Sequence, residues 1–113
     1  MSKYTLRTTI PRYWQRMLSE YCQSYSEIKK DLKSDDEKRR VQARKGIDAI
    51  DTCIMLIGMR DDLSGTTVRA LYANVCCGVS YDKMKDKPPC GKNQFYNLRK
   101  EFFELLYERM VCS

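Results

Sequence analysis

The sequence predicts an all-α protein of about five helices, and three observations lead to this prediction. Apolar residues recur at steps of three and four over long stretches of the 113-residue chain, as on one face of an α-helix. With five Gly and three Pro, few positions interrupt this period. Hydrophobic residues make up 42% of the chain and charged residues 32%, which is typical of a globular protein with one modest core. We expect two long N-terminal helices followed by a C-terminal helix-turn-helix, and no strand.

Residues 10–32 show the first long helical period. Pro11 suits the first turn of a helix, where its missing N–H removes no hydrogen bond. The stretch predicts an amphipathic helix of about six turns. Residues 1–9 lack this period and contain Lys3, Arg7 and no acidic residue, so we expect a basic arm there. The expected inward residues of the helix are Ile10, Trp14, Met17, Leu18, Tyr21, Tyr25, Ile28 and Leu32.

A second long helix is expected to begin within KSDDEKRR, residues 33–40. Ser34 or Asp35 can cap it, and Asp36 and Glu37 then lie at the positive end of its dipole. The helical period continues to about Arg60. Its first half is basic, whereas its second half is mostly apolar and is expected to be buried. The apolar positions are Val41, Ile47, Ile50, Ile54 and Ile57.

A third helix is predicted between the break at residues 60–65 and the sequence CCG at 76–78. Thr66 or Thr67 can cap this helix. Gly78 suits the left-handed position that closes a helix, and Ser80 can cap the next one, so the chain is expected to turn an abrupt corner. The apolar face consists of Val68, Leu71, Tyr72 and Val75.

The last third of the chain fits a helix-turn-helix. Residues 80–87 predict a supporting helix of about two turns with Tyr81 and Met84 inward, and the two prolines that follow make its continuation unfavourable. PPCG at 88–91 is the expected turn, and a longer helix is expected at 92–110. We therefore divide the chain into an N-terminal region at 1–62, with the basic arm and two helices, and a helix-turn-helix region at 63–113. The expected apolar side of the last helix is Phe95, Leu98, Phe102, Leu105, Leu106 and Met110.

The first turns of the last predicted helix carry side chains that are suited to DNA. Asn and Gln amides can make paired hydrogen bonds to adenine in the major groove, and Lys and Arg suit phosphates. A helix-turn-helix presents the early residues of its second helix to the bases in this way. The expected base contacts are Lys92, Asn93, Gln94, Tyr96 and Asn97, and the expected phosphate contacts are Arg99, Lys100, Ser80 and Lys83.

The sequence GVSYDKMKDKPPCGKNQFYNLRKEFFELLYERM resembles the C-terminal helix-turn-helix of ArpU/RinA-type regulators of phage late transcription, which is similar to sigma-factor region four. The likeness covers about residues 46–110. Two departures are Pro88 and Pro89, where the family has a leucine and a small residue, and Gly91, where it has a Ser or Thr cap. The resemblance implies a regulator that binds near a promoter and assists the host RNA polymerase. The matching residues are Gly78, Ser80, Tyr81, Met84, Phe95, Tyr96, Arg99 and Lys100.

Composition argues against several other classes of protein. The net charge of +6 favours a polyanionic partner. The chain has no His, and its six Cys form neither a Cys-x-x-Cys pair nor a disulfide framework, so we expect no cofactor, no metal and no enzyme activity. The longest apolar stretch, residues 53–59, is too short to cross a bilayer. With no signal peptide recognised, the expected location is the cytoplasm of a bacterial host cell.

Two interpretations of the first helix remain open, and they set the expected partners. Its apolar stripe can pack on the helix-turn-helix as core, or its aromatic residues can form an interface. In the second case we expect a homodimer through residues 10–57. The leading expectation is a regulator that binds double-stranded DNA and contacts the host RNA polymerase, without a membrane. The alternatives are a phage protein-interaction module that acts on a host or phage protein, and a small terminase subunit.

Overall fold

The fold is all-α, as predicted, and a computed structural model describes residues 10–112. Within this range there are five α-helices, a few short 3-10 or π-helical segments and no strand. The predicted basic arm at residues 1–9 lies outside the described residues. In chain order the elements are α1 (Arg12–Gln23), α2 (Tyr25–Lys30), η1 (Asp31–Lys33), α3 (Glu37–Gly58), α4 (Thr66–Leu71), η2 (Tyr72–Cys76), η3 (Tyr81–Lys83), α5 (Lys92–Tyr107) and η4 (Glu108–Cys112).

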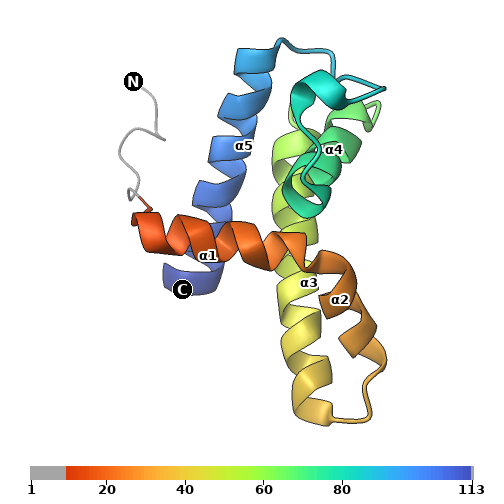
Figure 1. Ribbon diagram of the computed structural model, residues 1–113, viewed down its shortest axis with the longest axis vertical. Coiled ribbons are helices and arrows are strands. Elements are labelled where there is room, and N and C mark those ends of the chain that lie inside the picture. Colours follow the sequence, from red (N-terminus) through yellow and green to blue (C-terminus); the bar gives the residue numbers. More distant parts are fainter. Residues whose placement is uncertain (1–9, 113) are drawn as a thin grey trace.

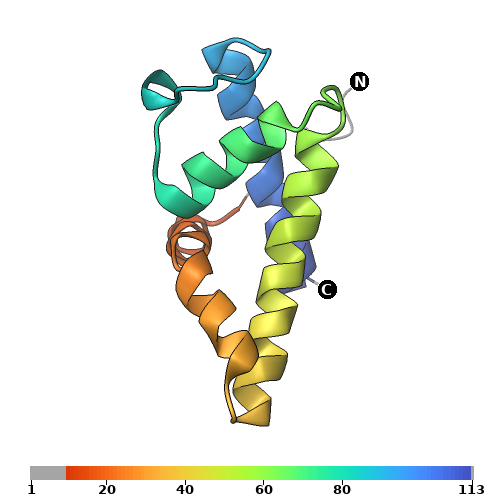
Figure 2. The ribbon, with the colours of Figure 1, turned by 90° about the vertical axis from the view of Figure 1, so that its right-hand side faces the viewer.

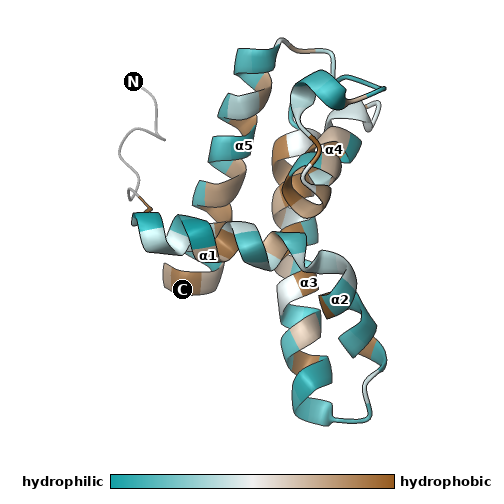
Figure 3. Cartoon of the chain, in the orientation of Figure 1, coloured by the Kyte–Doolittle hydropathy of each residue, from teal (hydrophilic) through white to brown (hydrophobic). Residues whose placement is uncertain are grey.

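Two long helices, α3 and α5, run antiparallel and form the frame of the molecule (Figure 1). α1 crosses this pair, and α4 packs beside the C-terminal half of α3. The first turns of α3 extend beyond α4 and the start of α5, and α2 and η1 pack beside them (Figure 2). Figure 3 shows that the apolar surfaces of α3, α4 and α5 face one another, while the outer side of α5 is hydrophilic. The largest fully buried side chains are Phe95, Phe102, Phe103, Ile50, Ile54, Leu71 and Leu106.

The first predicted helix, residues 10–32, is not continuous. It breaks at Ser24, whose hydroxyl donates to the carbonyl of Glu20 at 3.1 Å and competes with the regular helical pattern. The bend directs Tyr25 toward α3. Met17 was expected to face inward but is 53% exposed, whereas Cys22, which is not among the expected inward residues, is fully buried. The other expected inward residues are buried or half-buried, so most of the stripe is core.

The cap of the second helix is neither Ser34 nor Asp35, the two expected residues, but the residue after them. Asp36 is the N-cap, and its carboxylate accepts a hydrogen bond from the Lys38 N–H at 3.0 Å. The hydroxyl of Ser34 accepts from the Asp36 N–H instead of capping the helix itself. The four predicted isoleucines are buried, but Val41 is 54% exposed, because it lies on the side of α3 that faces away from them.

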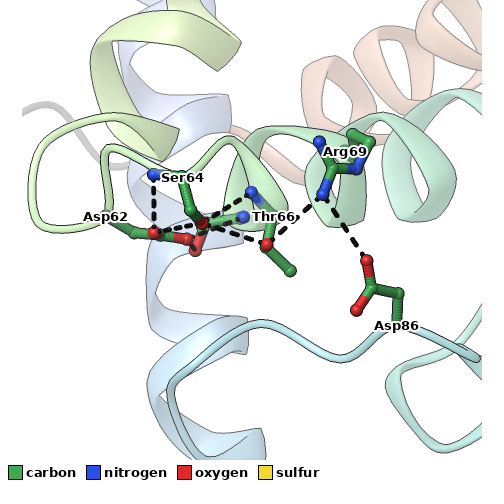
Figure 4. A network of polar contacts seen from close by, with 6 residues as sticks. Asp62, Ser64, Thr66, Arg69 and Asp86 are labelled. Atoms are coloured by element: carbon green, nitrogen blue, oxygen red, sulfur yellow. Dashed lines mark hydrogen bonds and ion pairs between the residues drawn. The ribbon is translucent and has the colours of Figure 1, made fainter.

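The third helix is capped by a residue of the preceding loop and not by a residue directly before its first turn. Thr66 is its first residue, Gly65 at φ +90° precedes it, and neither Thr66 nor Thr67 is the cap that the sequence predicts. Instead, the Asp62 carboxylate accepts from the N–H and the hydroxyl of Thr67, at 3.0 and 2.7 Å. It also accepts from the N–H and hydroxyl of Ser64, as the loop network in Figure 4 shows. These hydrogen bonds hold the pKa of Asp62 well below its usual range.

The corner after the third helix forms at the predicted glycine. Gly78 has φ +74°, the left-handed conformation that suits Gly. The Gly78 N–H bonds to the Asn74 carbonyl and the Val79 N–H to the Ala73 carbonyl, both at 3.0 Å. Each bond spans one residue more than in a Schellman motif, because the helix ends in the π-helical turn η2.

The supporting helix predicted at residues 80–87 does not form. Only the 3-10 turn η3 is present, and Met84 already has the extended values φ −73° and ψ 133°. Pro88 and Pro89 supply no N–H, and a helix this short gains too few hydrogen bonds to offset its nucleation. The Lys87 ammonium donates to the Met84 carbonyl at 3.0 Å in place of a backbone donor. As predicted, Met84 is buried and Tyr81 packs inward.

The last helix begins at the predicted residue. α5 starts at Lys92 with Gly91 as a cap that has no side chain, and it becomes π-helical in η4 from Glu108. Met110, expected on the apolar side, is 38% exposed, whereas Phe103 and Tyr107 are buried without having been predicted. The remaining apolar positions are buried, apart from the half-buried Leu105. A single core includes residues from both sides of the boundary at 62/63.

Candidate nucleic-acid interface

The first turns of α5 present an exposed polar stripe. Asn93, Asn97 and Lys100 are separated by four and three residues, which places them on one face of the helix. All three are exposed, and no hydrogen bond or ion pair within the described residues engages their side chains. The opposite face carries Phe95 and Phe102, each fully buried. The helix is therefore fixed to the core on one side and free on the other, and we call these three residues the α5 stripe.

Gln94 belongs to a neighbouring surface. It is exposed, but it lines a small pocket of about 60 Å³ together with Asp61, Asp62 and Pro89. This pocket lies where the α3–α4 loop and the 84–91 loop meet α5. Two carboxylates therefore lie near Gln94, and a phosphate would be repelled there. Among the predicted base contacts, Gln94 is therefore less suited to reach DNA than the residues of the α5 stripe.

Tyr96 has an internal role that the sequence analysis did not foresee. Its hydroxyl accepts a hydrogen bond from the Tyr81 N–H at 3.2 Å, and its ring packs edge-on against Phe95 at 5.4 Å between centroids. The Tyr81 hydroxyl in turn donates to the Cys90 carbonyl at 3.0 Å. These contacts join η3 and the 84–91 loop to the start of α5. Tyr96 therefore holds the loop and is half-buried.

Arg99 is likewise engaged inside the protein. Its Nε donates to the Asn74 Oδ1 at 2.7 Å, and its guanidinium carbon lies 4.9 Å from the centroid of the Phe103 ring. Asn74 also donates to the Val79 carbonyl at 3.0 Å, so this pair connects the corner to α5. Arg99 was expected to contact phosphate, but its guanidinium is half-buried and already bonded.

Lys92 forms an ion pair at the surface. Its ammonium lies 2.7 Å from the Asp82 carboxylate, and both side chains are more than half exposed. The hydrogen bond to Lys92 lowers the pKa of Asp82, and the same bond raises the pKa of Lys92. An exposed pair of this kind contributes little to stability. Lys92 is therefore available to a phosphate, in competition with Asp82.

The 80–91 segment, which bonds to Lys92 and Tyr96 at the start of α5, carries further cations. Lys83 and Lys85 are exposed, and no interaction of their side chains within residues 10–112 is found. Lys87 instead turns back to the loop carbonyls and the face of Tyr81. Ser80 is half-buried at the start of η3, where its carbonyl accepts from the Lys83 N–H. Of the two residues predicted here to contact phosphate, Lys83 is the more accessible.

The basic first half of α3 lies at the other end of the molecule. Lys38, Arg40 and Lys45 belong to the protruding hairpin of α2 and α3, whereas α5 begins at the opposite end of the long axis (Figure 1). The molecule measures 43 Å along this axis. The two basic surfaces are therefore separate.

A half-buried polar cluster joins two tyrosines to Asp51 on the other side of the core. The hydroxyls of Tyr25 and Tyr72 both donate to the Asp51 Oδ1, at 2.6 and 2.5 Å, and their rings pack edge-on. Burial and the Asp51 carboxylate raise the pKa of Tyr25 to about 12, and the pKa of Tyr72 rises for the same reasons. The cluster joins α2, α3 and η2. It stabilises the bend at Ser24 and offers no open site.

The thiols and the surface add no second chemical site. The six cysteines are unpaired, and burial raises the pKa of Cys53 to about 11 and that of Cys76 to about 12. Within residues 10–112 no group of three or more Cys, Asp and Glu side chains is arranged to hold a metal ion.

None of the helices in this range is long and apolar enough to span a membrane. Comparisons with protein families, with curated proteins and with solved structures found no match to this chain.

Proposed function

We propose that this chain binds double-stranded DNA through the N-terminal half of α5. The observation that carries the proposal is the α5 stripe: two amides and a lysine, exposed and unengaged, on a helix whose opposite face is locked into the core. Asn93 and Asn97 are the base-reading side chains, since an amide can both donate to and accept from adenine. Gln94 and Lys92 lie beside these two residues and reach bases only at the edge of the DNA surface that α5 covers.

Phosphate contacts in this proposal come from Lys100, Lys83 and Lys85. All three are exposed; Lys100 belongs to the α5 stripe, and Lys83 follows Tyr81 and Asp82, which bond to the start of α5. Tyr96 and Arg99 act indirectly, because they fix the loop and the corner against α5. A long loop thus replaces the supporting helix of a helix-turn-helix, and the angle of α5 is set by Tyr81, Tyr96 and Asn74.

The biological role that we propose is regulation of phage or prophage late genes in the cytoplasm of a bacterial host. It rests on the resemblance of residues 46–110 to ArpU/RinA-type regulators. In that role the DNA-bound protein assists the host RNA polymerase. The observed loop at 84–91 departs from the family layout in the segment that contains the two prolines.

Fluorescence anisotropy with random and phage-genomic duplexes at two salt concentrations tests the proposal. We expect salt-dependent binding and a preferred sequence. Substitution of Asn93, Asn97 and Gln94 by Ala should remove the preference while leaving the fold intact. A chain that binds neither duplex at low salt, or a triple variant with unchanged preference, would contradict the assignment.

The second candidate is a non-enzymatic protein-interaction module. Tyr13 and Met17 favour it, because they are 63% and 53% exposed on the outer side of α1. Such a protein retains the fold and shows no salt-dependent DNA binding. A small terminase subunit is a third candidate, and light scattering would reveal its ring as a mass many times that of the 13.4 kDa chain.

A further inference from the structure

The outer face of α3 is exposed along the whole helix and carries both apolar and charged side chains. The exposed residues of α3 lie on the side of the helix that faces away from the buried Ile50, Ile54 and Ile57, and η4 lies beside part of the helix. Val41, Met55 and Leu56 on this helix are 54, 46 and 53% exposed. They lie on or beside one stripe, since positions 41, 45, 48, 52, 55 and 59 follow the alternating three- and four-residue spacing of a helix–helix seam.

The two ends of this face differ. Near the N-terminus of α3 is a shallow hollow of about 410 Å³, with Leu32 and Val41 as its apolar residues and Arg44 and Lys45 among the side chains around it. Toward the C-terminus the face carries Met55 and Leu56, whose apolar side chains project outward. One end thus offers a hollow with an apolar floor, and the other offers apolar side chains that can fill it.

We propose that a second copy of this chain covers this face, with the two α3 helices antiparallel. A two-fold axis near the level of Ile50 places Met55 and Leu56 of each copy opposite the hollow of the other. The aliphatic stems of Arg44 and Lys45 then pack on these side chains while their charged groups stay in water. An interface of this type is isologous, because the same patch serves both copies.

The charges on α3 decide between antiparallel and parallel pairing. In a parallel pair, Arg44, Lys45 and Asp48 would each face their own counterpart in the other copy, which is repulsive. In the antiparallel pair, Asp48 faces the hydroxyl of Thr52. Lys38 at the basic end then lies near Asp61, which is 80% exposed beyond the other end of α3. Charge complementarity therefore selects the antiparallel arrangement.

This inference does not rest on DNA binding, because it uses only the outer face of α3. It refines the sequence-based expectation of a homodimer through residues 10–57. The aromatic stripe of residues 10–32 is mostly core, so the interface moves to α3. The start of α5 lies beside the C-terminal end of α3 (Figure 1), and an antiparallel dimer would therefore present its two α5 stripes at opposite ends.

Sedimentation velocity of the full chain over a wide concentration range, without DNA, is the first test. We expect a mass of twice the 13.4 kDa monomer at high concentration. Met55→Glu with Leu56→Glu should return the protein to a monomer with an unchanged circular dichroism spectrum. Met17→Glu is the matched control, since Met17 is equally exposed on α1 and should leave the dimer intact. A monomeric wild-type chain, or a double variant that still dimerises, overturns the proposal.

Cross-linking tests the orientation. In a background with the exposed thiols Cys77 and Cys112 changed to Ser, Val41→Cys and Met59→Cys are prepared as separate proteins. A mixture of the two should form a disulfide-linked heterodimer, because positions 41 and 59 face each other in the antiparallel pair. Disulfide formation by each protein with itself, and none between them, would indicate parallel pairing and overturn the proposed arrangement.

Discussion

The Asn74 side chain accepts a 2.7 Å hydrogen bond from the Nε of Arg99, twenty-five residues further along the chain. The same amide donates to the Val79 carbonyl, which follows the corner glycine. One side chain therefore joins the end of the third helix, the corner and the middle of α5. The relationship matters for any DNA contact, because it helps to fix the direction in which α5 points.

Asn74→Ala is expected to destabilise the fold. It removes the hydrogen bonds of Asn74 to the half-buried Arg99 guanidinium and to the Val79 carbonyl, and such a loss costs about 1–3 kcal/mol. Urea denaturation measures the change in the free energy of unfolding. Asn97→Ala is the matched control on the exposed side of α5, and we expect its effect to stay within about 0.5 kcal/mol. Equal effects for the two variants would show that the Asn74–Arg99 bond does not hold the corner.

Asp82→Asn is expected to strengthen DNA binding, given the proposed function. The substitution removes a carboxylate 2.7 Å from the Lys92 ammonium and frees that cation for a phosphate. Anisotropy titrations should show tighter binding and a salt dependence that is steeper by about one unit. Lys100→Ala should do the opposite for all sequences, with a slope that is flatter by about one unit. Weaker binding by Asp82→Asn would argue that Lys92 does not face the DNA.

The sequence predicted the helices well where burial alone decides, and less well where polar groups compete. The period of Ile47, Ile50 and Ile54 marks a buried face, and this face is found. Ser24 interrupts its helix by bonding to a carbonyl four residues back, which an apolar period cannot reveal. The short length of the supporting helix and Pro88 after it are sequence signals against its formation. The loop that replaces the helix is held by tertiary contacts of Tyr81, which the sequence does not reveal.

The candidate site could also be predicted only in part, because burial fixes some of its side chains and polar contacts fix the others. Asn93, Asn97 and Lys100 are exposed because the pattern of apolar residues fixes the orientation of α5. Tyr96 and Arg99 fall on the border of that face, where a side chain can turn either outward or inward. Their partners, Tyr81 and Asn74, are distant in sequence, and only the folded chain brings each pair together.

Stability is expected to fall at alkaline pH. Burial raises the pKa of Cys53 from 9.0 to about 11, and burial with the Asp51 hydrogen bond raises that of Tyr25 from 10.0 to about 12. A group with a raised pKa in the folded chain contributes its full stabilisation below its unfolded pKa, and loses it as pH rises through the folded value. The free energy of unfolding should therefore be level between neutral pH and about pH 9, and it should decline between about pH 9 and 12.

The Tyr25→Phe variant separates the tyrosine from the thiol contribution. It should be less stable at neutral pH, because a hydrogen bond to Asp51 is lost, and its decline above pH 10 should be shallower. Denaturation is followed in the presence of a reductant, so that the six thiols stay free. A free energy of unfolding that stays level to pH 12 in the wild-type chain would contradict the prediction.

Gly58→Ala is expected to destabilise the protein more than Gly46→Ala, although both glycines are buried within α3. A Cβ at Gly58 would lie 2.7 Å from the Val68 Cγ2 and 3.0 Å from the Val68 Cα, so α4 itself would have to move away. A Cβ at Gly46 would overlap the hydroxyl of Tyr21, which is the far end of a side chain and can rotate away. Ala also favours a helix over Gly by about 1 kcal/mol, which offsets part of the cost at either position.

The measurement is the free energy of unfolding of both variants by urea denaturation. We expect Gly58→Ala to lose about 1–3 kcal/mol, as overpacking against backbone does, and Gly46→Ala to change less. Tyr21→Ala combined with Gly46→Ala provides the control, because without the tyrosine ring the added methyl group should be stabilising relative to Tyr21→Ala alone. The opposite ranking of Gly58 and Gly46 would mean that α4 adjusts more easily than Tyr21, so the close approach of α3 and α4 would not be a rigid contact.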